Sequence, residues 1–154
     1  MGYAFLVAAP ERALLLECGV VDVRASTAAA ERLLAIAKAL DELIRRHRPT
    51  VLAVERLFFN KNALTAMRVS EARGIALLCG ARAGLEIFEY TPQDVKVSVT
   101  GNGRSDKKAI QKMLPLLVTI DAPITQDNVA DAVAIALTHA QRSRFAAAVA
   151  AAST

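Results

Sequence analysis

The apolar run Val51-Leu52-Ala53-Val54, which ends in the carboxylate Glu55, decides the fold class. It has no alternation of polar and apolar residues, and this is typical of a strand that is covered on both faces. We therefore predict a central strand here. Such strands belong to sheets flanked by helices, so the segments before and after it should alternate between helix and strand.

The rest of the chain shows this alternation. Further strands are expected at residues 2–9, 13–23 and 86–90, with Pro10-Glu11-Arg12 turning the first two into an antiparallel hairpin. Helices are expected from Ser26 or Thr27 to His47, over 63–83 and 92–99, from Ser105 or Asp106 to a bend or end at Pro115, and from Asp127 or Asn128 to Ser143. The pattern predicts an α/β fold in one domain, residues 1–143, followed by an Ala-rich tail, residues 144–154.

Composition narrows the classes of protein that fit. The chain has 154 residues, of which 54% are hydrophobic, and a net charge of +4. A disordered or fibrous protein is excluded, and no apolar run reaches the roughly 18 residues of a membrane span. The N-terminus does not resemble a signal peptide, and Cys18 and Cys79 are expected to be free, buried thiols, so a cytoplasmic location is predicted. The mild positive charge permits a nucleic-acid partner without requiring one.

Glu55 is the first candidate functional residue. The carboxyl end of a central strand is where α/β sheets usually place ligands, and a rigid strand end holds a side chain in place. A solvated residue at a strand-to-loop junction explains Glu55 equally well.

A second candidate group is Asp127, Asn128 and Asp131, which share one face at the start of the last expected helix. Helix capping explains Asp127 or Asn128. It explains Asp131 less well, because that residue is flanked by apolar residues in a helix expected to be buried nearly all round. A buried carboxylate needs a partner, and a divalent cation is one such partner.

Two loops provide weaker signals. The segment Gly101-Asn102-Gly103-Arg104-Ser105-Asp106-Lys107-Lys108 could approach a phosphate, or it could be a flexible turn with solvated lysines. Phe58 and Phe59 lie side by side in a polar loop, where one could wedge against a base, although core packing is the usual role of phenylalanine.

Together and in this order, the motifs resemble those of the RuvC family of Holliday-junction resolvases. The matching stretches cover nearly the whole chain and are Ala53–Phe58, Asn62, Glu71–Gly74, Tyr90, Gln93–Lys96, Val99–Gly103, Lys107 and Ala130–His139. The resemblance implies a ribonuclease H-like mixed sheet flanked by helices, and a homodimer formed through the helix 63–83. It also implies Mg²⁺- or Mn²⁺-dependent cutting of two strands of like polarity at a four-way DNA junction, in recombination and repair, with two cations in each site. A branch-migration motor complex is an implied further partner.

The resemblance also assigns roles to individual residues. It implies that Glu55, Asp131 and Lys107 are catalytic and that Glu55, Asp131, Asn128 and Asp127 bind metal. It implies that the DNA-binding residues are Phe58, Lys61, Arg73, Lys96, Arg104 and Lys107.

The sequence departs from the family pattern in two places. Family members open with a strand carrying Asp-Pro-Gly, whose Asp binds metal, whereas residues 1–6 match the strand that normally comes second. We therefore expect a truncated chain that cuts junctions poorly. Asn128 stands where many relatives carry Asp, and Asp127 is the alternative ligand. Two other interpretations remain: a junction-binding module without nuclease activity, and a ribonuclease H-like nuclease acting on RNA or damaged DNA. A purely structural protein would leave Glu55 and Asp131 unexplained.

Overall fold

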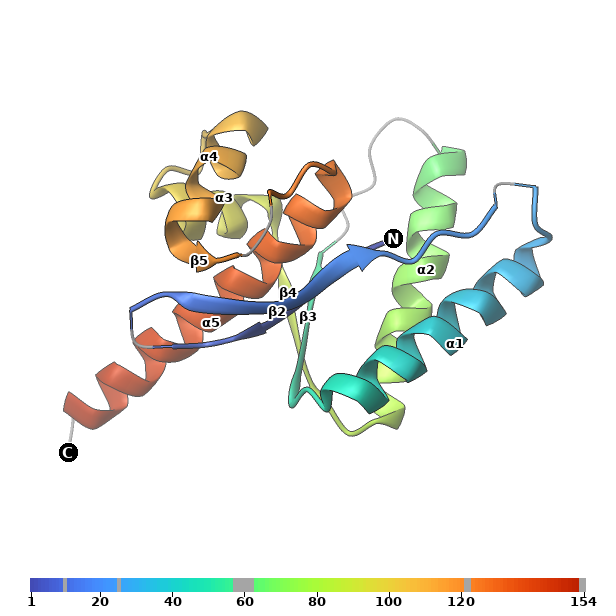
Figure 1. The fold of residues 1–154 in the computed structure, drawn as a ribbon, viewed down its shortest axis with the longest axis horizontal. Coiled ribbons are helices and arrows are strands. Elements are labelled where there is room, and N and C mark those ends of the chain that lie inside the picture. Colours follow the sequence, from blue (N-terminus) through green and yellow to red (C-terminus); the bar gives the residue numbers. More distant parts are fainter. Residues whose placement is uncertain (10, 25, 57–62, 121–122, 153–154) are drawn as a thin grey trace. The chain divides into compact units, whose positions relative to one another are not determined.

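The structure is a computed structural model that describes residues 1–9, 11–24, 26–56, 63–120 and 123–152. The chain divides into two compact units (Figure 1). One unit consists of Met1 with Val21–Glu89, and the other consists of Gly2–Val20 with Tyr90–Thr154. We call them the Glu55 unit and the Asp131 unit and describe each by itself.

The Asp131 unit is built on a mixed three-stranded sheet. Strands β1 (Gly2–Val7) and β2 (Ala13–Val20) form the predicted antiparallel hairpin, and β5 (Val118–Thr119) pairs in parallel with the start of β2. The sequence did not predict β5, because a strand of two residues has no pattern of its own and is defined by its pairing with Ala13 and Leu14.

Three helices complete this unit (Figure 1): α3 (Pro92–Thr100), α4 (Lys107–Leu117) and α5 (Asp127–Ala152). Helix α5 packs along β1 and β2 and against α3 and α4. The core side chains are almost completely buried and include Leu114, Val118, Val133, Leu137 and Thr138. Helix α5 thus lies at the centre of the unit, and its first turns carry the predicted acidic residues.

In the Glu55 unit, the helices α1 (Ala29–His47) and α2 (Ala63–Arg82) lie side by side (Figure 1), and α2 also packs against β3 (Val51–Glu55). Strand β3 pairs with β4 (Glu86–Tyr90) in a two-stranded sheet. Gly80 of α2 meets Leu52 of β3 so closely that an added Cβ would lie 2.6 Å from Leu52 Cδ2. The absence of a side chain at Gly80 therefore allows the close packing of helix on strand.

The strands and helices confirm the predicted order, with several differences in detail. The predicted cap of α1 at Ser26 or Thr27 is wrong, because the N-cap is Ala28 and no side chain caps the helix. Helix α4 continues past Pro115 to Leu117. Helix α5 continues past Ser143 to Ala152, since a run of alanines favours helix. The boundary between a domain at 1–143 and a tail stays a prediction.

Burial also differs from expectation at three sites. Strand β3 is half-buried along Val51–Val54 and pairs with β4 alone among the described strands, so it is not the central strand covered on both faces that we predicted. Both cysteines are free, but only Cys79 is buried and Cys18 is half-buried. The side chain of Asp131 is 51% exposed, so the helix is not buried all round as expected. An apolar run predicts contact with other elements, but how completely they cover it depends on their packing.

Candidate active site

The candidate site in the Asp131 unit is an acidic pair bridged by a lysine. Asp127 and Asp131 lie one turn apart at the start of α5, and Lys107 is the first residue of α4. The ammonium of Lys107 lies 3.1 Å from Asp131 Oδ2 and 3.4 Å from Asp127 Oδ2. Both carboxylates therefore present an oxygen to one positive centre, and all three side chains reach solvent.

Lys107 is placed by the cap of its helix and by the loop before it. Asp106 is the N-cap of α4 and accepts a hydrogen bond from the backbone N–H of Ala109 at 2.8 Å. In the preceding loop, the Thr100 hydroxyl bonds the Ser105 hydroxyl at 2.7 Å, and Asn102 Oδ1 accepts from the Arg104 N–H at 3.0 Å. These bonds support the conformation of the loop that leads into α4, and the alternative of a flexible turn stays untested.

Gln111 is a member of the site that the sequence analysis missed. Its Nε2 donates a hydrogen bond of 2.9 Å to Asp127 Oδ1, while the other oxygen of that carboxylate is the one near Lys107. Gln111 lies four residues after Lys107 and so shares its face of α4. That spacing was the signal available in the sequence.

The charges of the site stabilise one another. Partial burial disfavours the charged form of Lys107, but the hydrogen bonds and attraction of Asp131 and Asp127 outweigh it and raise the pKa of the ammonium. Lys107 is therefore a fixed positive charge at neutral pH. Chemically, the cluster can hold a cation between the carboxylates or present the ammonium to an anion such as a phosphate.

A set of polar contacts braces α3 against α5 in the same unit. Arg142 pairs with Asp94 at 2.6 Å and lies over the Tyr90 ring, and the Tyr90 hydroxyl is 2.9 Å from His139 Nδ1. Hydrogen bonds from Thr91, together with Arg142, lower the pKa of Asp94 to about 2. The brace fixes α3, which carries the half-buried Lys96, relative to the helix that carries Asp131.

The Glu55 unit places its candidate carboxylate at the exposed end of β3, as predicted. The backbone carbonyl of Glu55 accepts a hydrogen bond of 3.1 Å from Arg73 Nε, and Arg73 also pairs with Glu89 at 2.8 Å. The guanidinium of Arg73 is thus engaged with the protein, and its expected contact with DNA stays a prediction.

Two more of the predicted residues, Arg104 and Asn128, are described in the Asp131 unit. Arg104 and Asn128 are exposed, at the loop before α4 and in the first turn of α5. Phe58 and Lys61 lie outside the described residues. Their expected roles at DNA stay predictions.

The donors of the Asp131 unit fit a hard divalent cation in kind. Carboxylate oxygens are the ligands that Mg²⁺ and Mn²⁺ prefer, and Asp127 and Asp131 already share one cationic group in Lys107. Within the described residues, no group of three or more His, Cys, Asp or Glu side chains gathers around one point. The acidic pair would therefore need further ligands.

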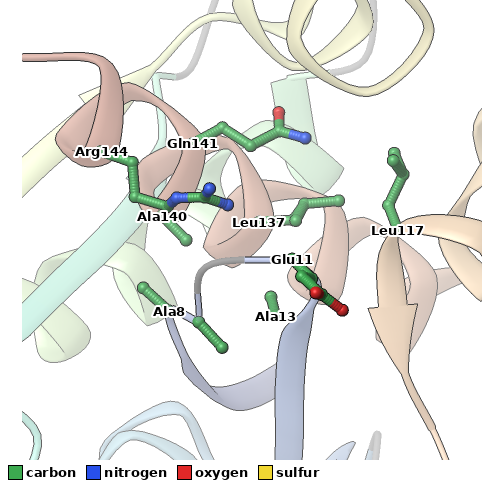
Figure 2. Close-up of a pocket in the computed structure, with 9 residues that line it drawn as sticks. Ala8, Glu11, Ala13, Leu117, Leu137, Ala140, Gln141 and Arg144 are labelled. Carbon is green, nitrogen blue, oxygen red and sulfur yellow. The ribbon is translucent and has the colours of Figure 1, made fainter. Parts of the chain in front are cut away.

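The hollow shown in Figure 2 is not a substrate pocket. It lies between the turn of the β1–β2 hairpin and α5 and is lined by residues such as Glu11, Leu137 and Arg144. Its volume of about 50 Å³ is far below the several hundred Å³ of a typical ligand-binding pocket. It includes none of the predicted site residues.

Among the described residues, no helix is both long and apolar enough to span a membrane.

Comparison with known proteins places these features in a family. Residues 1–139 match the family model described as crossover junction endodeoxyribonuclease RuvC. A protein of that name from Pelotomaculum thermopropionicum is 44% identical over 139 residues, which cover 90% of this chain and 85% of the relative. One from Brachyspira hyodysenteriae is 42% identical over 144 residues, which cover 94% of this chain and 89% of the relative.

Solved structures agree with this match. The structure of Thermus thermophilus RuvC superposes with a TM-score of 0.86 at 30% identity, covering 94% of this chain and 89% of that one. The same protein in complex with a Holliday junction substrate gives a TM-score of 0.84 at 30% identity, and the match covers 95% of this chain and 96% of that one.

The fold is therefore that of the ribonuclease H-like α/β proteins, with a mixed sheet and flanking helices. Within that class, the chain belongs to the RuvC family of crossover junction endodeoxyribonucleases. This confirms the family and fold inferred from the sequence motifs.

Proposed function

We propose that this protein resolves four-way DNA junctions by metal-dependent hydrolysis of phosphodiester bonds in two strands of like polarity. The observation that carries the proposal is the contact of Lys107 with Asp131 and Asp127, because an ammonium can bind phosphate and carboxylates can bind a divalent cation. Family membership supplies the substrate class, since a relative of similar fold was solved with a Holliday junction.

In this proposal, Glu55 and Asp131 would each serve as a ligand of Mg²⁺ or Mn²⁺, and Asp127 or Asn128 would be a further ligand beside Asp131. When bound, the cations would activate a water and stabilise the leaving oxygen. Asp131 projects from the rigid start of α5, so its carboxylate is oriented before the substrate binds. Lys107 carries a permanent positive charge. Its ammonium can exchange its contacts with the carboxylates for a contact with the scissile phosphate, where negative charge develops.

We propose that Lys96, Arg104 and Lys107 contact DNA, and that Phe58 and Lys61 do so as well. Lys96 lies on α3, and Arg104 and Lys107 follow in the bonded loop and helix after it, so all three belong to one continuous stretch of the Asp131 unit. Phosphate contacts by such residues position the protein, and an aromatic side chain can stack in an opened junction. The net charge of +4 supports an anionic partner.

The proposed dimer forms through α2. Met67 and Leu78 are 60% and 53% exposed, and together with Gly74 they recur at near-whole helical turns along one face. Large exposed apolar side chains aligned in this way are typical of a protein interface. A second copy of the chain is the partner that two cuts at one junction require.

The proposal also includes a branch-migration motor as a partner and a cytoplasmic location. The free thiols Cys18 and Cys79 support a reducing compartment.

The experiment that tests the function is Mn²⁺- and Mg²⁺-dependent cutting of a synthetic four-way junction. We expect paired nicks by the parental chain at a low rate, because its sequence lacks the family's Asp-Pro-Gly motif. We expect Glu55→Gln and Asp131→Asn to abolish cutting while junction binding, measured by gel shift in Ca²⁺, is kept. Binding without any cutting in either metal would contradict the nuclease proposal. Preference for an RNA–DNA hybrid or a plain duplex in competition would contradict the junction specificity.

A further inference from the structure

Arg73 connects three elements of the Glu55 unit. It lies in the middle of α2. Its Nε donates a hydrogen bond of 3.1 Å to the backbone carbonyl of Glu55, at the end of β3, and its Nη2 lies 2.8 Å from Glu89 Oε2 on β4. The same Glu89 oxygen is 3.7 Å from Arg56 Nε, just beyond β3. The carboxyl end of the strand that presents Glu55 is therefore fastened to a helix and to the neighbouring strand.

The chemistry of this contact favours arginine. A planar guanidinium can donate to a carbonyl and a carboxylate at the same time, whereas an ammonium is a point charge on a flexible stem. The side chains of Arg73 and Glu89 are only 23% and 35% exposed, so water weakens their attraction less than it would at an open surface. Helix α2 is a rigid base for the contact, because Cys79 and Gly80 are buried in the packing with α1 and β3.

We propose that Arg73 is a positioning residue for Glu55, oriented by Glu89, and that it is not a DNA contact. This inference rests on the proposed role of Glu55 as a metal ligand. Because the hydrogen bond is made to the backbone carbonyl of Glu55, Arg73 fixes the place from which the carboxylate projects. A shift of about 1 Å in such a ligand can cost on the order of 100-fold in rate.

The test compares Arg73→Ala with a control that removes another ion pair of helix α2. Arg32→Ala removes the ion pair of Arg32 with Glu71 of α2, which has a length of 2.7 Å and similar exposure, 16% and 36%, but involves no residue at the end of β3. Both variants should lower the unfolding temperature to a similar degree. Arg73→Ala alone should lower the cutting rate of bound junction about 10- to 100-fold and weaken Mn²⁺ binding, measured from the free-Mn²⁺ resonance signal.

Two further measurements separate positioning from other roles. Junction affinity in Ca²⁺ should stay within about twofold of the parental value for Arg73→Ala, since no phosphate contact is lost. Arg73→Lys should recover stability through its charge next to Glu89 but not the cutting rate, because one ammonium does not reproduce the second hydrogen bond.

Three results would overturn the inference. One is a tenfold loss of junction affinity with normal cutting of the bound junction, which would make Arg73 a DNA contact. Another is loss of cutting in both Arg73→Ala and Arg32→Ala in proportion to stability. The third is unchanged Mn²⁺ affinity in Arg73→Ala. If the parental chain binds Mn²⁺ but does not cut, the proposed function fails, and the Mn²⁺ comparison between the two variants still decides the role of Arg73.

Discussion

The ammonium of Lys107 lies 3.1 Å from Asp131 Oδ2, although the two residues are separated by a helix, a strand and a loop. The contact joins the first residue of α4 to the second turn of α5. Helix α5 is fixed by its packing on the hairpin, and α4 is fixed by the cap at Asp106. The charge pair therefore follows from how two separately stabilised helices are placed.

Replacing Lys107 should remove a charge on which both the carboxylates and the phosphate depend. We expect Lys107→Met to lower the rate of junction cutting about 100-fold, the size of effect seen when one preorganised donor is lost. The measurement is single-turnover cutting of a bound junction at saturating Mn²⁺. Lys108→Met, at the neighbouring exposed position, is the control and should cut at close to the parental rate. Equal losses in the two variants would show that only general positive charge matters.

Stability should depend on pH through Asp94. Its folded-state pKa is lowered to about 2, first by hydrogen bonds from Thr91 and then by Arg142, so the ionised carboxylate stabilises the fold. This contribution is complete above the unfolded pKa of about 3.9 and is lost as the pH falls toward 2. We expect Asp94→Asn to cost about 1–2 kcal/mol at pH 7, after allowance for partial exposure, and almost nothing at pH 2. Urea unfolding at both pH values measures the difference, and a cost that does not change with pH would contradict the assignment.

Gly2 should not tolerate a side chain. An added Cβ would lie 1.9 Å from the backbone oxygen of Asn128, so either β1 or the start of α5 would have to move. We expect Gly2→Ala to cost about 1–3 kcal/mol, the usual range for overpacking. It should also slow junction cutting, because Asp127 and Asp131 lie on the displaced turns. The control is Gly74→Ala on α2, where a Cβ would meet nothing within 4 Å. Parental stability in Gly2→Ala would show that the close approach is relieved without cost.

The proposed dimer face should be sensitive to charge. Leu78 is 53% exposed on α2, and Leu78→Glu would place a carboxylate within the apolar face that it forms with Met67. We expect this variant to be monomeric by light scattering at concentrations where the parental chain is a dimer. Leu34→Glu changes a leucine of similar exposure, 55%, on α1 and should leave the dimer intact. A parental chain that is monomeric at high concentration would contradict the interface.

The order of helices and strands was predictable because each element has a local pattern. Helix α1 ends where Pro49 requires it, and α3 starts at Thr91 and Pro92 with a capping box. Errors arose where a local rule competed with packing or propensity. The Ser26 and Thr27 side chains lie too early to cap the helix, because it begins only after Ala28.

The candidate site was predictable in part. The identities of Glu55, Lys107, Asp127 and Asp131 followed from family motifs, and the structure places the last three together. Gln111 was missed because a glutamine on a helix indicates no particular function until its hydrogen-bond partner, here Asp127, is known. The resemblance assigned Arg73 to DNA, and the structure adds its contacts with Glu55 and Glu89, which no local pattern of the sequence indicates.

The sequence by itself determined which elements form and which side chains can bind metal or phosphate, because helix caps, apolar periodicity and ligand chemistry are local properties. Tertiary structure alone decided that Lys107 bridges two carboxylates and that Arg73 holds the backbone of Glu55. Each of these contacts joins residues from different elements, and the distance between them depends on how the buried faces of those elements pack. No local pattern in the chain encodes that distance.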